Sequence, residues 1–345
     1  MINTAIIGYG LSGRVFHAPF IHTNENFDLK KVVQRKGDLA REHYPNVEIV
    51  RDYKALLHDP DLELIVIATP NEFHFQMAKD CLDAGKHIVI EKPFMPTSGE
   101  AERIISLAEQ KKLNVFVYQN RRFDGDFMTL QQLIDSRWLG DINYFEAHFD
   151  RFSPKRTRAA WRDEVLPGSG ILFDLGSHLI DQVLCLFGKP LALRAKVEKQ
   201  RPGSMVDDFF EISMIYPEMT AVVTAGMLVR DHELRYRLEG SSGKYTKFGI
   251  DVQESHLKKG LMPVGDDWGE EPASDWGHLS LSKDGLVMEG TLKTKAGNYM
   301  DFYDNVYEVM RAKGEMVIKP REAMEVIRMI ERAFESHDLN KEIEC

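Results

Sequence analysis

The sequence predicts two domains in series: an α/β domain with a doubly wound parallel sheet, then an α+β domain with a large, mostly antiparallel, open-faced sheet. Expected strands and helices alternate over the first third of the 345 residues. A Gly-x-Gly-x-x-Gly sequence separates the first expected strand from the first expected helix. Beyond residue 121, longer strands with period-two patterning replace this alternation. We therefore divide the chain into domains 1–120 and 121–345.

The first domain is assembled from short apolar runs that are each followed by a helical pattern. The expected strands are "TAIIG", "FDLKKVVQ", "LELIVIATP", "HIVIEKP" and "NVFVYQN". The third is almost continuously apolar, as expected of a strand that is buried on both faces of a parallel sheet. Expected helices cover about residues 12–23, a short stretch after Asp38, about residues 72–84 before Gly85, and the segment after the Thr97–Glu100 capping box. Parallel sheets of this kind bind ligands at the carboxyl ends of their strands.

The second domain has the patterning of an antiparallel sheet with helices on one face. The expected strands are "INYFEAHFDR", "ALRAKVEKQ", "DDFFEISMIY" and "TAVVTAGMLV". Helical spacing is found in "FMTLQQLI", "FDLGSHLIDQVLCLF", "MDFYDNVYEVM" and "REAMEVIRMIERAF". "GSSGK" predicts a tight turn, and residues 251–280 predict a long surface excursion.

Composition excludes several classes of partner. The formal net charge of -10 argues against a nucleic-acid partner, because phosphate contacts require clustered Lys and Arg. No apolar run approaches the roughly 20 residues of a membrane span, so no membrane partner is expected. The first residues lack the positive region of a signal peptide. With three cysteines, an odd number, we expect a cytoplasmic protein without a disulfide framework.

The glycine-rich turn in "IIGYGLSG" has the features of a dinucleotide-binding loop. Gly8 allows the tight turn, Gly10 lets a pyrophosphate approach the backbone, and Gly13 lets the following helix pack closely on the sheet. The start of that helix presents free N–H groups and a positive dipole end to the phosphate. The loop residues are Gly8, Tyr9, Gly10, Leu11, Ser12 and Gly13. Because the loop follows a strand and opens a helix, we predict a Rossmann-type NAD(P)-binding domain at 1–120.

The end of the second expected strand bears on the choice of cofactor. NAD sites usually place an acid there for the ribose hydroxyls. This chain has Arg35 at that point; Asp28 lies at the other end of the strand, and Asp38 lies past the turn. The missing carboxylate removes repulsion against a 2′-phosphate, and Arg35 can pair with that phosphate. The alternative is a solvated Arg-Lys turn, so NADP is preferred and NAD remains possible.

Two segments carry candidates for hydride-transfer chemistry, which needs a proton acceptor and a group that stabilises the developing alkoxide. Lys92 ends a strand at the ligand-binding edge; its alternative reading is a surface Glu-Lys pair. Asp174 and His178 lie four residues apart, on one face if the segment is helical. A carboxylate beside an imidazole raises its basicity and selects its tautomer. The alternative is a helix-terminal acid with a structural histidine. No cluster of ligand spacing predicts a metal.

The motifs "GYGLSGRVFHAPF", "ATPNEFH", "AGKHIVIEKPF", "YQNRRFD" and "FDLGSHLIDQ" together resemble the glucose–fructose oxidoreductase, inositol dehydrogenase and rhizopine-catabolism (Gfo/Idh/MocA) family. The resemblance spans nearly the whole chain. "NRRFDGDF", "HFDRFSP" and "LGSHLIDQ" are most similar to the bacterial NADP-dependent scyllo-inositol dehydrogenases. The resemblance implies that Lys92, Asp174 and His178 are catalytic and that the Lys92–Pro93 bond is cis.

The same resemblance implies further cofactor contacts. Thr69, Pro70, Asn71 and His74 match a segment along the adenosine and pyrophosphate, Glu91 and Lys92 a pair beside the nicotinamide, and Gln119 a position near its carboxamide. Trp161 and Arg162 resemble a loop that closes over cofactor and substrate. That loop, "RFSPKRTRAAWR", is strongly basic. It can be a lid that attracts cofactor phosphate or a solvated loop.

The resemblance implies an NAD(P)-dependent dehydrogenase or reductase that acts on a secondary hydroxyl of a cyclitol or sugar, such as scyllo-inositol or an inosose. Residues 121–345 would bind substrate and form a homodimer or homotetramer through their sheet. The family also includes non-catalytic cofactor-binding regulators and redox-neutral glycosidases that hold NAD, and both remain alternatives.

Overall fold

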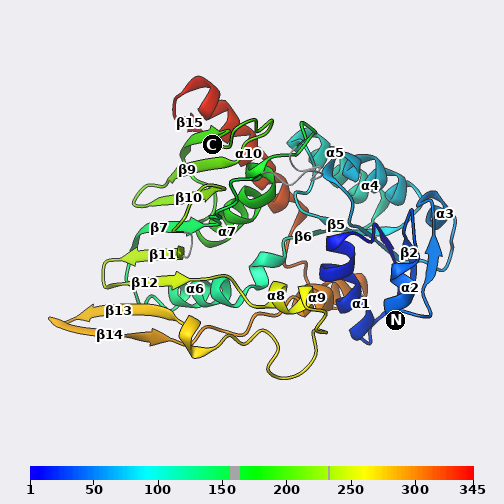
Figure 1. Cartoon of the computed structure of the whole chain (residues 1–345), viewed down its shortest axis with the longest axis horizontal. Helices are drawn as coiled ribbons and strands as arrows, with labels where there is room; N and C mark the ends of the chain where they lie inside the picture. Colours follow the sequence, from blue (N-terminus) through cyan, green and yellow to red (C-terminus); the bar gives the residue numbers. More distant parts are fainter. Residues whose placement is uncertain (156–163, 232–233) are drawn as a thin grey trace. The chain divides into compact units, whose positions relative to one another are not determined.

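The computed structural model describes residues 1–155, 164–231 and 234–345 (Figure 1). The chain folds into two compact units. Unit 1 consists of Met1–Phe123, Val252–Trp268 and Asn298–Met324. Unit 2 consists of Asp124–Asp251, Gly269–Gly297 and Glu325–Cys345. The functional division predicted at residues 120 and 121 stays a prediction.

Unit 1 contains the predicted doubly wound sheet. Its strands are β1 (Ile2–Ile7), β2 (Phe27–Val33), β3 (Glu48–Val50), β4 (Leu64–Ile67), β5 (His87–Glu91) and β6 (Val115–Tyr118). They are all parallel, in the order β3-β2-β1-β4-β5-β6. This is the strand order of dinucleotide-binding domains, in which the ligand lies where the order reverses. Every side chain of β4 is fully buried, as its continuous apolar pattern predicts.

Helices cover both faces of this sheet. One face packs on α3 (Lys54–Leu57), α4 (His74–Asp83) and α5 (Ser98–Lys111). The other packs on α1 (Ala18–Thr23), α2 (Leu39–His43), α8 (Gln253–Lys258) and α9 (Met300–Met310). The second set therefore includes two helices from late in the chain. The predicted surface excursion over 251–280 is wrong for its first part, because Gln253 is fully buried and α8 packs on the sheet of unit 1.

Unit 2 contains a mixed sheet in the order β14-β13-β12-β11-β7-β10-β9-β8-β15. Its strands are β7 (Ile142–His148), β8 (Ala192–Glu198), β9 (Phe209–Ile215), β10 (Thr220–Gly226), β11 (Leu234–Gly240), β12 (Gly243–Phe248), β13 (Gly277–Lys283), β14 (Leu286–Leu292) and β15 (Ile343–Glu344). All the pairings are antiparallel except that of β7 with β10. The predicted α+β class is confirmed, and the "GSSGK" turn joins β11 to β12.

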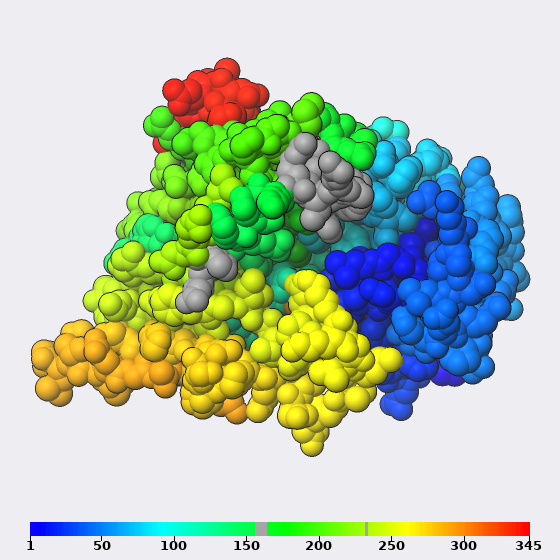
Figure 2. Space-filling model, viewed as in Figure 1, coloured from blue at the N-terminus to red at the C-terminus, as the bar shows by residue number. Residues whose placement is uncertain are grey.

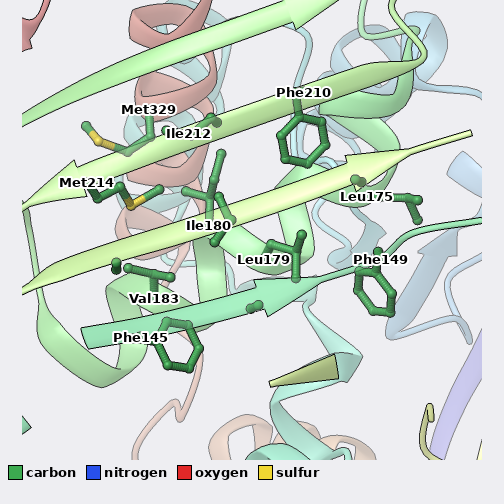
Figure 3. Close-up of a cluster of buried hydrophobic side chains, with 14 of the residues drawn as sticks. Phe145, Phe149, Leu175, Leu179, Ile180, Val183, Phe210, Ile212, Met214 and Met329 are labelled. Atoms are coloured by element: carbon green, nitrogen blue, oxygen red, sulfur yellow. The ribbon is translucent and has the colours of Figure 1, made fainter. Parts of the chain in front are cut away.

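One face of this sheet carries the apolar core of unit 2. Phe145, Phe210, Ile212 and Met214 from the strands meet Leu179, Ile180 and Val183 from α7 (Ser177–Phe187), as Figure 3 shows. The core also includes residues of α6 (Gly125–Asp135) and of α10 (Pro320–Leu339), a helix within which the division between the units falls. On the opposite face, Glu146, His148 and Val222 are half-exposed, which makes the sheet open-faced.

The β13–β14 hairpin projects from the sheet of unit 2, in orange in Figure 2. Leu286, Val287 and Met288 near its tip are 77%, 66% and 63% exposed. Among the described residues, no helix combines the length and apolar character that a membrane span requires.

Candidate active site

The glycine loop follows β1 in the conformation that its three glycines predict. Gly8 has a φ of +99°, and a Cβ atom there would collide with the carbonyl oxygen of Ala68. A Cβ on Gly13 would collide with the carbonyl oxygen of Gly8. A Cβ on Gly10 would meet nothing within 4 Å. Close packing thus requires glycine at positions 8 and 13, whereas the backbone at Gly10 is open to a ligand.

A pocket of about 730 Å³ opens beside this loop within unit 1. Six of the predicted cofactor residues line it: Gly8, Tyr9, Gly10, Arg35, Thr69 and Pro70. The lining also includes the apolar side chains of Phe73 and Met77, and that of Tyr53, which follows β3. Its size is within the range of ligand sites, and its walls combine apolar surface with a few charged groups. The pocket lies at the carboxyl edge of β1 and β2, where a dinucleotide-binding sheet holds the adenosine half.

Three cationic side chains line the pocket near the ends of β2 and β3: the predicted Arg35, its neighbour Lys36, and Arg51. Arg51 follows β3, and its guanidinium donates to the Gln34 carbonyl at 2.8 Å and to the Gly37 carbonyl at 2.5 Å. Sequence reasoning missed Arg51, because the three residues of β3 are too few to show a strand pattern. An arginine directly after "EIV" was the available signal.

Acids are also present at this end of the pocket, and one of them is paired. Arg51 Nη2 lies 2.7 Å from Asp38 Oδ1, which neutralises the nearest carboxylate of the β2–α2 loop. Asp52 is part of the lining, and its Oδ1 accepts the Lys54 backbone N–H at 3.0 Å. Arg35, Lys36 and Arg51 thus face two acids, Asp38 and Asp52, and the balance stays positive, which favours an anionic ligand group.

Glu91, the last residue of β5, is buried where the glycine loop meets the end of the strand. Its Oε1 accepts a hydrogen bond from the Ser12 hydroxyl and lies 3.0 Å from His17 Nε2. Its Oε2 accepts the backbone N–H of Lys92 at 3.0 Å. Burial by itself would raise the pKa of Glu91, but His17, Ser12 and the charge of Lys92 outweigh it and lower the pKa. Glu91 is thus an ionised anchor for the start of the Lys92 loop.

The loop after β5 begins with the cis Lys92–Pro93 peptide bond, which confirms the prediction. His74, fully buried in α4, lies against this loop: its Nδ1 is 3.1 Å from the Pro93 carbonyl oxygen, and its Nε2 is 3.0 Å from that of Thr69. Burial lowers the pKa of His74. The structure thus places His74 behind the pocket, where it joins the loops after β4 and β5, rather than in the pocket lining. Asn71, also buried, stands at the start of the 3₁₀ turn before α4.

Gln119 follows β6 and is 2% exposed. Its Oε1 has no hydrogen-bond partner among the described residues. An orphaned buried amide oxygen is costly unless a ligand satisfies it, so it marks a place for a polar group. Together with the open backbone at Gly10, it makes this edge of unit 1 fit a dinucleotide that carries a carboxamide.

Asp174 and His178 belong to unit 2, on the helical segment that leads into α7. The segment is helical, as its spacing predicts, but Leu172–Gly176 forms a π-helical turn and the α-helix begins at Ser177. Asp174 lies on the π turn and is half-buried, whereas His178 lies one turn later and is buried. The ring of Phe149 meets that of His178 edge-on at 6.2 Å between centroids. π turns of this kind are frequent at functional sites.

Asp207 secures the start of this turn. Its Oδ2 accepts the Leu172 N–H at 2.7 Å, and its backbone carbonyl accepts the Ile171 N–H at 3.0 Å. Burial raises its pKa to about 6, against the opposing effect of the backbone hydrogen bonds. Gly170 has a φ of +94°, and a Cβ there would collide with the Asp207 carboxylate. Sequence reasoning missed Asp207, although an Asp-Asp pair before an apolar strand was a visible signal.

Arg235 supports the other side of His178. It is 1% exposed, and its guanidinium lies 3.7 Å from the centroid of the Phe149 ring. Its Nε is 3.6 Å from Asp126 Oδ2, and its Nη1 donates to the His148 carbonyl at 2.9 Å. A cation over the face of an aromatic ring is attracted by the ring quadrupole. Phe149 is thus held between the guanidinium and the histidine.

The predicted site residues are distributed over both units. Unit 1 holds Gly8, Tyr9, Gly10, Leu11, Ser12, Gly13, Arg35, Thr69, Pro70, Asn71, His74, Glu91, Lys92 and Gln119, and unit 2 holds Asp174 and His178. Leu11 is exposed at the outer side of the loop. Trp161 and Arg162 lie outside the described residues. Within the described ranges, no three His, Cys, Asp or Glu side chains are grouped as metal ligands.

Comparisons with known proteins match both units of the chain. The family described as "Oxidoreductase family, NAD-binding Rossmann fold" matches residues 2–119, and "Oxidoreductase family, C-terminal alpha/beta domain" matches residues 131–344. Both are the Gfo/Idh/MocA models. An uncharacterized oxidoreductase of Escherichia coli, YdgJ, is 37% identical over 97% of this chain and 96% of its own length.

Two further relatives come from Bacillus subtilis. The scyllo-inositol 2-dehydrogenase (NADP(+)) IolW is 34% identical over 97% of this chain and 93% of its own length. The solved structure of YvaA superposes with a TM-score of 0.95 at 33% identity, over 100% of this chain and 99% of that protein. Both domain models and the identity over nearly the whole length give the same answer: the chain belongs to the Gfo/Idh/MocA family of oxidoreductases, with an NAD-binding Rossmann domain.

Proposed function

We propose that this oxidoreductase uses NADP in preference to NAD and acts on a secondary hydroxyl, or the corresponding ketone, of a cyclitol or sugar. The observation that carries the proposal is the hydrogen bond from Ser12 to Glu91. It joins the dinucleotide loop to the residue that precedes Lys92, so a cofactor on that loop would lie beside the Lys92 side chain. The similarity to a protein named scyllo-inositol 2-dehydrogenase (NADP(+)) supports both the substrate class and the cofactor.

The preference for NADP is supported by the charge of the pocket. Arg35, Lys36 and Arg51 converge where the ribose of the adenosine half would lie, and Arg51 neutralises Asp38. A 2′-phosphate is a dianion that pairs with guanidinium groups through two parallel hydrogen bonds. Asp52 is the acid in the lining that can bind a ribose hydroxyl, so NAD remains a weaker alternative.

The proposed mechanism assigns one task to each of three side chains. Bound NADP supplies the hydride acceptor. His178 takes the hydroxyl proton, and Asp174 orients the imidazole and stabilises its positive charge. The Lys92 ammonium donates to the same oxygen as charge develops on it. His178 is buried and the ring of Phe149 packs edge-on against it, which limits the orientations open to the imidazole.

The test is a panel of inositols, inososes and aldoses, each with NADP and NAD, followed by absorbance of the reduced cofactor. Lys92→Ala and His178→Ala are each expected to lower kcat by about 10²- to 10⁴-fold, the usual contribution of an acid–base group. The exposed Lys30→Ala and His58→Ala serve as matched controls. Near-normal turnover in both site variants would defeat the mechanism. Substrate conversion without release of reduced cofactor would instead indicate the redox-neutral alternative.

We also propose that the open face of the unit 2 sheet joins copies of the chain into a homodimer or homotetramer. The support is the alternation on β7 and β10, where one face holds the core and the other keeps Glu146, His148 and Val222 half-exposed. A large sheet with one solvated face is free to pair with a second copy of itself.

A further inference from the structure

A buried chain of hydrogen bonds continues from Glu91 into unit 1. His17, whose Nε2 lies 3.0 Å from Glu91 Oε1, has its Nδ1 2.6 Å from the hydroxyl oxygen of Tyr303. Both His17 and Tyr303 are 0% exposed. The chain joins four separate segments: the glycine loop through Ser12, the π-helical turn Gly13–His17, the end of β5, and α9.

The Glu91 end of this chain has a fixed hydrogen-bond direction. An ionised Glu91 carboxylate can only accept, so His17 Nε2 carries a hydrogen and donates it. Burial raises the pKa of Tyr303 well above its usual value, so the phenol keeps its hydrogen. The Tyr303 hydroxyl and His17 Nδ1 are thus joined by a hydrogen bond of 2.6 Å between two side chains that are closed to water.

We propose that His17 is a positioning residue for Lys92: it fixes the rotamer of Glu91, whose other oxygen holds the Lys92 backbone. This inference rests on the proposed role of Lys92 and adds a residue that the sequence motifs did not single out. The two carboxylate oxygens of Glu91 have different partners. Oε1 receives His17 and Ser12, so Oε2 stays directed at the Lys92 N–H.

The local backbone is consistent with this task. His17 closes the π-helical turn that follows the glycine loop, and its ring also packs on Tyr118, with 4.4 Å between the ring centroids. A π turn inserts an extra residue into a helix and so turns the next side chain away from its α-helical direction, which is why such turns mark functional sites. Here the side chain at that point reaches the end of β5 while its ring packs on Tyr118.

The test compares two replacements of His17. His17→Gln keeps an N–H donor near the position of Nε2, whereas His17→Leu removes the donor and keeps apolar bulk. Tyr303→Phe removes only the hydroxyl of the relay. His22→Gln, an exposed histidine of α1, and Tyr307→Phe on α9 are the matched controls. Thermal denaturation identifies any variant that fails to fold.

Two readouts separate positioning from general stability. The first is the single-turnover rate at saturating NADPH and substrate, with the Kd for NADPH measured by calorimetry. His17→Leu is expected to lower that rate about 100-fold, the cost of misplacing a reacting group by about 1 Å, with little change in Kd. Tyr303→Phe is expected to lower the single-turnover rate about tenfold. His17→Gln is expected to have a rate much closer to that of the wild type than His17→Leu has.

The second readout needs no substrate. Competitive acetylation of amines, followed by peptide mass spectrometry, reports how Lys92 is held in the free protein. His17→Leu is expected to raise the labelling rate of Lys92 about threefold or more, because a Glu91 carboxylate that keeps only Ser12 on Oε1 holds the Lys92 backbone less firmly. Labelling of the exposed Lys30 should not change.

The outcomes distinguish this inference from the proposed function. If Lys92→Ala abolishes turnover but His17→Leu keeps both the wild-type rate and the wild-type labelling, the positioning role is wrong and the catalytic role stands. If Lys92→Ala is fully active, the proposed function fails. In that case labelling of Lys92 decides alone whether His17 restrains it. If His17→Leu binds NADPH more weakly, with a higher Kd, but keeps the wild-type single-turnover rate, the positioning role is also wrong.

Discussion

At the scale of single residues, the site depends on charges whose partners are specified one by one. Glu91 remains ionised inside the protein because His17, Ser12 and Lys92 all favour its charged form. Asp207 is the opposite case, since burial keeps its proton to a pH near 6. Two buried carboxyl groups thus differ in charge at mildly acidic pH because one has donors and a cation and the other has mainly backbone N–H groups.

Arg51 is expected to set the preference for NADP together with Arg35. Arg51→Gln should weaken binding of 2′,5′-ADP by about 10- to 100-fold, the value of a charge-assisted hydrogen bond, and leave 5′-AMP nearly unchanged. Arg51→Lys, which keeps the charge, should weaken binding of 2′,5′-ADP less. Calorimetric titration with both nucleotides measures the effect, and Lys30→Gln is the control. An equal loss for both nucleotides would show that Arg51 only shapes the loop.

Asp207 predicts a pH dependence of stability. Its pKa is raised from 3.8 to about 6, so between these values the folded state binds a proton that the unfolded state releases. The free energy of unfolding therefore falls as pH rises through this window, by about 3 kcal/mol for this group. Asp207→Asn keeps an acceptor for the Leu172 N–H and removes the titration. Its Tm should exceed that of the wild type at pH 7.5 and lose this advantage near pH 4. A constant difference in Tm would contradict this assignment.

At the scale of elements, the two units begin their candidate site helices in the same unusual way. The glycine loop leads into the π turn Gly13–His17, and the Gly170 turn leads into the π turn Leu172–Gly176. Each π turn carries or precedes a residue of the proposed site. The helix α5 is different, because it begins with a regular cap: the Thr97 hydroxyl accepts the Glu100 N–H at 3.2 Å.

That cap gives a prediction for the stability of unit 1. Thr97→Ala should destabilise the protein by about 1 kcal/mol, the usual cost of a lost N-cap, and should lower Tm by a few degrees. Thr97→Ser keeps the hydroxyl and should behave like the wild type. Differential scanning calorimetry of the three proteins makes the comparison. Equal Tm values for the Ala and Ser variants would argue that backbone geometry alone starts α5.

The sequence predicted the elements whose signal is local and missed those that depend on distant partners. The capping box at Thr97, the glycine loop and the continuous apolar β4 carry their own evidence. The sequence of α8 carries no such evidence. The buried Gln253 Oε1 accepts hydrogen bonds from the Tyr299 N–H at 2.8 Å and from Trp268 Nε1 at 3.3 Å, and these contacts form only in the folded unit. The π turns were likewise invisible, since their residues have ordinary helical patterning.

For the site, the sequence motifs identified which residues to consider but not what holds them. Lys92 was predicted from its place at the end of a strand, and Asp174 and His178 from their spacing, with the family resemblance behind all three. His17, Arg51 and Asp207 act through contacts between strands, loops and helices that no such signal reveals. At His74 the motif predicts a cofactor contact, which stays a prediction, and the structure adds that its ring lies against the backbone carbonyls of Thr69 and Pro93.

At the scale of the whole molecule, the proposed assembly can be tested on the open face of the unit 2 sheet. Val222 is half-exposed there and pairs across the sheet with Glu146 and Ser213. Val222→Asp places a second acid beside Glu146, and an unpaired charge of this kind is costly to bury in an interface. Light scattering after gel filtration should show a shift toward monomer. Leu339→Asp, at the exposed end of α10, is the control, and an unchanged mass for Val222→Asp would place the interface elsewhere.

The return of the chain to unit 1 limits how the protein can be cut. α8 and α9 lie late in the chain, yet Leu257, Phe302, Tyr303 and Val306 cover one face of the parallel sheet. A fragment ending at Phe123 would keep α1 and α2 but leave the part of that face under α8 and α9 uncovered, and His17 would lose its contact with Tyr303. Such a fragment is expected to aggregate when expressed alone. The nucleotide-binding half of this protein is therefore a unit in space that no single stretch of its gene encodes.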